Sequence, residues 1–140
     1  MQITWTENMS VGVKSFDDDH KNLIRLIDEL HGVLQDDDAE EEILSEKNEL
    51  ALHRLENYIR SHCNREEIAM AKTDYAGLEE HKQEHAKLAA MIAEMSWRFR
   101  GSTDPRHIAE IMEFIYNWFT NHINVTDKKY AAHLNSRGIF

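Results

Sequence analysis

Apolar residues recur three and four positions apart in four long segments of this chain, roughly residues 16–34, 39–71, 78–99 and 105–122. This spacing gathers apolar side chains on one face of an α-helix. The stretches between the segments are short, which favours helices that run in opposite directions beside their neighbours. The pattern therefore predicts an all-α protein, an antiparallel up-down-up-down four-helix bundle, as a single domain over residues 1–140.

Residues that commonly cap helices locate the expected helix ends. Ser15 is predicted to be the N-cap of a first helix that begins near Phe16. Gly101 is predicted to end the third helix, with Asp104 and Pro105 as the N-cap and first residue of the fourth. Residues 1–14 are expected to form an irregular arm, residues 36–42 a solvated acidic loop running into the second helix, and residues 126–134 a short C-terminal helix.

Histidines and carboxylates occupy places on the apolar faces of these helices. Side chains four apart on a helix lie about 5–6 Å from each other on one face. Burying many ionisable groups is costly unless something pairs with them, and a metal is the simplest partner. The candidate ligands that continue the apolar stripes are His20, His62, Glu66, His81, His85, His122 and Asp127.

This donor set suits a pair of metal ions. Imidazole is a good ligand for iron, zinc, copper and nickel, whereas carboxylates favour harder cations. The set is too large for one tetrahedral zinc. Two octahedral ions bridged by both carboxylates and by an oxygen atom would leave one coordination position open. On a reduced di-iron pair, a small diatomic ligand would bind there.

The spacing between His122 and Asp127 does not fit an ideal α-helix. With 3.6 residues per turn, a residue five positions later lies about 140° around the helix. A π-bulge would turn both side chains toward one point, and such bulges are frequent at functional sites. A helix irregularity is therefore predicted between His122 and Asp127.

The order and spacing of these motifs resemble the hemerythrin family, specifically its bacterial single-domain members, the bacteriohemerythrins. The resemblance covers roughly residues 5–137. It rests on Val11-Gly12-Val13 with Asp19-His20-Lys21, on His62 with Glu66-Glu67, on His81-x-x-x-His85, and on the stretch from Trp118 to Asp127.

The resemblance implies reversible O₂ binding at a non-haem di-iron centre with a bridging oxo or hydroxo group, rather than enzymatic activity. NO and small anions such as azide are further expected ligands. By the same resemblance, His81, His85 and His122 would ligate one iron, His20 and His62 the other, which keeps the vacancy, and Glu66 and Asp127 would bridge them.

The oxygen pocket is also implied by the resemblance. Trp118, Phe119 and Ile123 match the positions that wall the family's pocket. Cys63 departs from the pattern, because the family usually has phenylalanine after this histidine. A thiol there leaves a smaller, more polarizable wall beside the vacant iron, so pocket size and oxygen stability are expected to differ.

Two other metal chemistries compete with this interpretation. His81, Glu84 and His85 match the His-x-x-Glu-His pattern of inverted zinc peptidases, with Glu84 as general base. That hypothesis leaves the other candidate ligands unexplained. A ferritin-like di-iron oxidase needs Glu-x-x-His on two helices, and the sequence contains no Glu-x-x-His.

Charge and cysteine content limit the binding partners and the cellular compartment that the sequence suggests. The net charge of −10 argues against nucleic acids and anionic membranes, since both reward clustered Lys and Arg. No apolar run approaches the roughly 18 residues of a spanning helix, and the N-terminus lacks the pattern of a signal peptide. With Cys63 as its one cysteine, the chain is expected to be cytoplasmic. The sequence does not separate an O₂ carrier or store from an O₂, NO or redox sensor, or from an iron store or donor.

Overall fold

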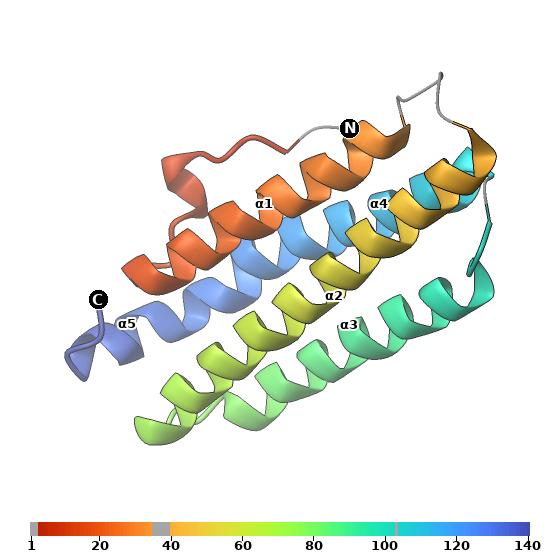
Figure 1. Ribbon diagram of the computed structural model, residues 1–140. Coiled ribbons are helices and arrows are strands. Elements are labelled where there is room, and N and C mark those ends of the chain that lie inside the picture. The colour runs from red at the N-terminus through yellow and green to blue at the C-terminus, as the bar shows by residue number, and fades with distance from the viewer. Residues whose placement is uncertain (1–2, 35–39, 103) are drawn as a thin grey trace.

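The computed structural model describes residues 3–34, 40–102 and 104–140. Four long helices form the bundle: α1 (Lys14–Leu34), α2 (Glu41–Lys72), α3 (Leu78–Arg98) and α4 (Pro105–Asn121). Helix α1 packs against α2 and α4, and α3 packs against the same two helices, so the helices close into a ring (Figure 1). The expected all-α, antiparallel four-helix bundle is confirmed.

Helix α4 is followed directly by further helical turns. It continues through a π-helical segment, η2 (His122–Asp127), into α5 (Lys128–Ser136). The predicted irregularity between His122 and Asp127 is therefore confirmed. The expected separate C-terminal helix is instead the direct extension of α4, and it begins at Lys128 rather than at residue 126.

The start of α1 differs from the prediction. Ser15 is not an N-cap, because it already lies inside the helix. The carbonyl of Val13 accepts hydrogen bonds from the backbone N–H groups of Phe16 and Asp17, so the first turn has formed by Lys14. The side chain of Asp17 reaches back to accept from the backbone N–H of Val11 at 2.8 Å. This contact fixes the arm to the helix.

The predicted start of α4 is confirmed: Asp104 accepts a hydrogen bond from the backbone N–H of Arg106, and Pro105 is at the first turn of the helix.

The N-terminal arm is mostly irregular, with one short 3₁₀ turn, η1 (Glu7–Met9). Its Val11 and Val13 are buried against the bundle. The side-chain amide of Asn135, on α5, donates to the carbonyl of Gly12 at 2.9 Å. The positive φ of Gly12, 76°, bends the arm toward this contact. The arm thereby ties the start of α1 to the C-terminal extension of α4.

At the other end of the bundle the apolar pattern of α2 is less regular than the sequence suggests. Ile43 is 46% exposed, whereas Asn48 is buried. The expected acidic loop falls largely on residues 35–39, outside the described residues.

None of the helices in the described part of the chain combines the length and apolar character that crossing a membrane requires.

Candidate metal centre

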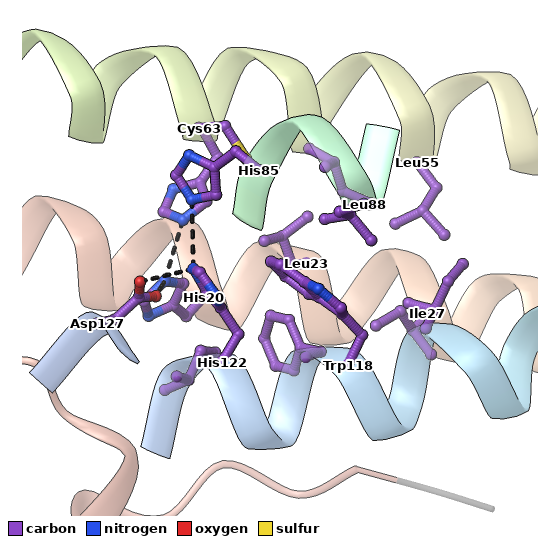
Figure 2. A pocket seen from close by; sticks show the side chains of 15 residues that line it. His20, Leu23, Ile27, Leu55, Cys63, His85, Leu88, Trp118, His122 and Asp127 are labelled. Atoms are coloured by element: carbon purple, nitrogen blue, oxygen red, sulfur yellow. Dashed lines mark hydrogen bonds and ion pairs between the residues drawn. The ribbon is translucent and has the colours of Figure 1, made fainter. Parts of the chain in front are cut away.

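The seven predicted ligands converge in the middle of the bundle. Each has at most 5% of its surface exposed, and Glu66 and Asp127 are fully buried. They come from α1, α2, α3 and the η2 extension of α4, so the site exists only once the bundle has closed. In Figure 2, Asp127 and the imidazoles of His20, His85 and His122 point toward one another, joined by dashed contacts.

The π-helical segment explains how His122 and Asp127 meet despite their spacing. A wider turn between them compensates the 140° rotation that an α-helix would impose. As a result, Nε2 of His122 lies 2.8 Å from Oδ1 of Asp127.

The ligand atoms fall into two overlapping groups, each within 4.8 Å of one another. We call the first the three-histidine half; it contains His81, His85 and His122. The second, the two-histidine half, contains His20 and His62. Glu66 and Asp127 belong to both groups.

Each shared carboxylate turns one oxygen toward each half. Oε1 of Glu66 lies 2.7 Å from Nε2 of His62, while Oε2 lies 3.2 Å from Nε2 of His81. Asp127 repeats the arrangement: Oδ2 is 3.2 Å from Nε2 of His20, and Oδ1 faces the three-histidine half. This is the disposition of carboxylates that bridge two cations.

Three further carboxylates fix the orientation of the imidazoles. Nδ1 of His62 lies 2.9 Å from Asp19, Nδ1 of His85 lies 2.9 Å from Glu67, and Nδ1 of His122 lies 2.9 Å from Glu84. A carboxylate beside Nδ1 favours the tautomer in which Nδ1 carries the proton and donates it. Nε2 is then a lone pair that faces the centre of the bundle.

This tautomer leaves lone pairs facing each other. Nε2 of His62 lies 3.0 Å from Nε2 of His20, whose own Nδ1 has no hydrogen-bond partner among the described residues to set its tautomer. Nε2 of His85 and Nε2 of His122, both set by a carboxylate, are 3.2 Å apart. Two acceptors at that distance repel unless a cation lies between them. The carboxylate of Asp127 also needs a cation or donor. Among the described residues neither of its oxygens has a partner with hydrogen-bond geometry, although imidazole nitrogens approach them closely. The donor set therefore fits metal ions.

The charge state of the buried groups agrees with this arrangement. Burial alone would raise the pKa of Glu66, but the charge on His62 and the contacts from His20 and His81 hold it well below its ordinary value. Burial would lower the pKa of His62; the charge of Glu66 and the contact with Asp19 raise it to about 10. Without metal, protons therefore take the place of cations between these groups.

Tyr130 anchors one of the bridging carboxylates. Its hydroxyl is buried and donates to Oε1 of Glu66 at 3.1 Å. Burial first, and the charges of Asp127 and Glu66 after it, raise the pKa of Tyr130 well above its ordinary value. The phenol consequently stays protonated and remains a donor.

An enclosed cavity adjoins both halves of the site (Figure 2). It offers about 20 Å³ to the centre of a water-sized sphere, and a single water needs roughly 10–15 Å³ by that measure. The space thus suits one small molecule. Its walls are mainly apolar, with Leu23, Ile27 and Leu55 from α1 and α2. All four residues expected around a pocket line it: Cys63, Trp118, Phe119 and Ile123.

Sequence reasoning missed the supporting carboxylates Asp19 and Glu67 and assigned Glu84 to a different chemistry. Each stands directly beside a candidate ligand in the sequence, yet each orients a histidine of the following helix: Asp19 on α1 serves α2, Glu67 on α2 serves α3, and Glu84 on α3 serves η2. An acidic residue next to each ligand was the available signal. The helix it faces could be seen only in the folded structure.

Comparisons with known proteins agree with this geometry. The family model described as the hemerythrin HHE cation binding domain matches residues 11–134. A bacteriohemerythrin from Methylococcus capsulatus is 30% identical over 96% of this chain and 98% of its own length. A myohemerythrin from Riftia pachyptila is 28% identical over 93% of this chain and 92% of its own.

The fold is similar to solved hemerythrin structures as well. A crystal structure of wild-type hemerythrin superimposes with a TM-score of 0.81 at 27% identity, covering 96% of this chain and 98% of that one. The family match begins at residue 11, near the end of the arm, and spans all of the long helices and the π-helical segment. The chain therefore belongs to the hemerythrin family.

Proposed function

We propose that this protein binds O₂ reversibly at a carboxylate-bridged di-iron centre. One observation carries the proposal: two groups of buried donors share Glu66 and Asp127 beside a cavity with room for one small molecule. His81, His85 and His122 would hold one iron, and His20 and His62 the other. When bound, the iron pair would supply the electrons that O₂ accepts and returns.

The protein's own contribution is to orient the metal ligands and to enclose the cavity beside them. Asp19, Glu67 and Glu84 hold three imidazoles with Nε2 toward the centre, and Tyr130 holds Glu66. The free coordination position would then belong to the two-histidine half, since that half has one imidazole fewer than the other.

The cavity walls would keep water from the bound gas. Trp118 stacks on the ring of His122 with centroids 4.1 Å apart, and Phe119 meets His20 edge-on at 6.0 Å. Burial, with smaller contributions from Glu66 and Asp127, raises the pKa of Cys63. The thiol therefore stays protonated and contributes a neutral wall.

The peptidase hypothesis is less well supported. Oε2 of Glu84 accepts a hydrogen bond from Thr126 at 2.9 Å and lies 2.9 Å from Nδ1 of His122. These contacts occupy the carboxylate that would have to activate water. The same di-iron site could serve sensing of O₂, NO or redox state, or iron storage. No contact within the described residues favours one of these roles over O₂ binding.

The test combines metal analysis with spectroscopy. The purified protein should contain about two irons per chain, the stoichiometry of carboxylate-bridged di-iron bundles. Anaerobically reduced protein should gain visible charge-transfer absorption on exposure to O₂ and lose it when O₂ is removed. A stoichiometric zinc, or irreversible bleaching after the first exposure to O₂, would refute the proposal.

A further inference from the structure

A groove on the outside of the bundle runs between α2 and α3. It encloses about 700 Å³ and is open to solvent. From α3 it is lined by Ala86, Ala89 and Ala93, all exposed, so the α3 side of the groove presents little side-chain bulk. The groove lies beside the metal centre rather than at an end of the bundle, because His85 is also part of its lining.

The groove and the enclosed cavity share a wall. Ile59, Cys63 and His85 line both of them. On α2, Ile59 and Cys63 are four residues apart and therefore neighbours on one helix face. The side chains of these three residues are what separates the space beside the metal ligands from the solvent in the groove. Figure 2 shows Cys63 and His85 on the α2 and α3 side of the cavity, opposite Trp118.

The three wall residues differ in how freely they can move. His85 is held by Glu67 at Nδ1 and belongs to the ligand group through Nε2. Ile59 is 8% exposed and packs into the apolar core. Cys63 is half-buried and has the smallest side chain of the three. Rotation of one thiol about a single bond is therefore the least costly way to open the wall.

Charges around the groove are mixed. Glu56 and Glu67 face Arg60 and Lys82 along its lining. Two acidic and two basic side chains give little net attraction for an ion of either sign, whereas a neutral molecule is indifferent to them. The groove thus suits an uncharged gas better than an anion.

We infer that the groove between α2 and α3 is the entrance through which a neutral diatomic gas reaches the cavity, and that Cys63 is its gate. This inference rests on the proposed function for the identity of the gas. A gate changes the rates of entry and exit by the same factor and leaves the equilibrium affinity unchanged. A residue that contacts the bound gas changes the affinity instead.

Ala89 offers a test from outside the cavity, because it lines the groove only. Ala89→Phe places a ring over the shared wall, while Ala90→Phe puts the same ring on a neighbouring exposed position of α3 that lines neither space. Stopped-flow absorption of the reduced iron protein should show O₂ association and dissociation rates both several-fold lower in Ala89→Phe, with an unchanged ratio. Ala90→Phe should match the unaltered protein. Equal rates in all three proteins would overturn the inference.

Cys63→Ala tests the gate itself. Removing the sulfur should raise both rates several-fold, since it widens the opening between Ile59 and His85. The ratio of the two rates is not the criterion for this variant, because Cys63 also lines the cavity. Circular dichroism and thermal unfolding serve as controls that each variant is folded. A Cys63→Ala protein with unaltered rates would show that gas enters elsewhere.

A second readout does not depend on iron. Trp118 lines the cavity, so O₂ that enters will quench its fluorescence. In full-length protein loaded with Zn²⁺, with Trp5→Phe and Trp97→Phe to isolate this signal, Ala89→Phe should reduce the quenching constant and Cys63→Ala should increase it. If these changes occur but the iron protein takes up no O₂, the entrance stands and the proposed function fails. If O₂ binds reversibly and neither variant alters quenching or rates, the entrance is wrong.

Discussion

The two halves of the candidate metal centre are built unequally. The three-histidine half draws two imidazoles from one turn of α3 and a third from η2, whereas the two-histidine half draws one each from α1 and α2. Both halves use the same two carboxylates. Both histidines of the two-histidine half line the cavity. Under the proposed function, this difference in the number of imidazoles would leave the free coordination position on the two-histidine half.

The largest expected effect on iron binding comes from removing a carboxylate that both halves share. Glu66→Ala takes one oxygen from each half and also strands the hydroxyl of Tyr130. Iron content should fall from about two per chain to near zero, as measured by metal analysis after desalting. The exposed Glu113→Ala is the matched control and should retain full iron. Normal iron content in Glu66→Ala would remove Glu66 from the ligand set.

Single histidine changes should separate the halves. His62→Ala leaves the two-histidine half with His20 and the shared carboxylates, so it should lose its metal while the other half keeps one. His85→Ala leaves two imidazoles, the number that the smaller half has naturally, and should retain both metals with weaker affinity. Competition with a chelator measures the difference. The reverse order of loss would contradict the assignment of halves.

The supporting carboxylates should have intermediate effects. Asp19→Asn acts on His62 in the two-histidine half, and Glu84→Gln acts on His122 in the three-histidine half. Loss of such a partner typically costs about 10–100-fold in metal affinity. Chelator titration should show that loss in each variant, and Asp18→Asn, at an exposed neighbouring carboxylate, should show none. An unaffected Asp19→Asn protein would mean that the carboxylate is not needed to orient His62.

The smallest expected effect concerns metal-free protein. The pKa is raised by nearby carboxylates from 6.5 to about 10 for His62 and to about 9 for His81, despite burial, which lowers both. A raised folded-state pKa gives stability that is complete below pH 6.5 and is lost as pH rises toward 9–10. The melting temperature of metal-free protein should therefore fall across that range, and metal binding should reverse the fall because it needs deprotonated imidazoles. A melting temperature that rises with pH would contradict the idea that protonated His62 and His81 stabilise the metal-free protein.

The sequence predicted the features that depend on spacing along one helix. The bundle, the cap at Asp104 and the irregularity between His122 and Asp127 follow from local periodicity and turn chemistry, and the structure confirms them. The positions of the candidate ligands on inward faces follow from the same periodicity.

Features that depend on how one helix faces another could not be predicted. Whether Glu84 meets His122 or a substrate depends on the rotation of α3 against η2. Ile43 is exposed and Asn48 is buried near the start of α2, and the apolar spacing of the sequence does not reveal this. The early start of α1 depends on Asp17 reaching back to the arm. The shared wall of Ile59, Cys63 and His85 likewise exists only between two packed helices.

The most direct test of the central claim is anomalous diffraction at the iron edge from crystals of the air-purified protein. The account predicts two peaks, one bounded by His81, His85 and His122 and one by His20 and His62, with Glu66 and Asp127 between them. A single peak, or peaks away from these seven side chains, would contradict it.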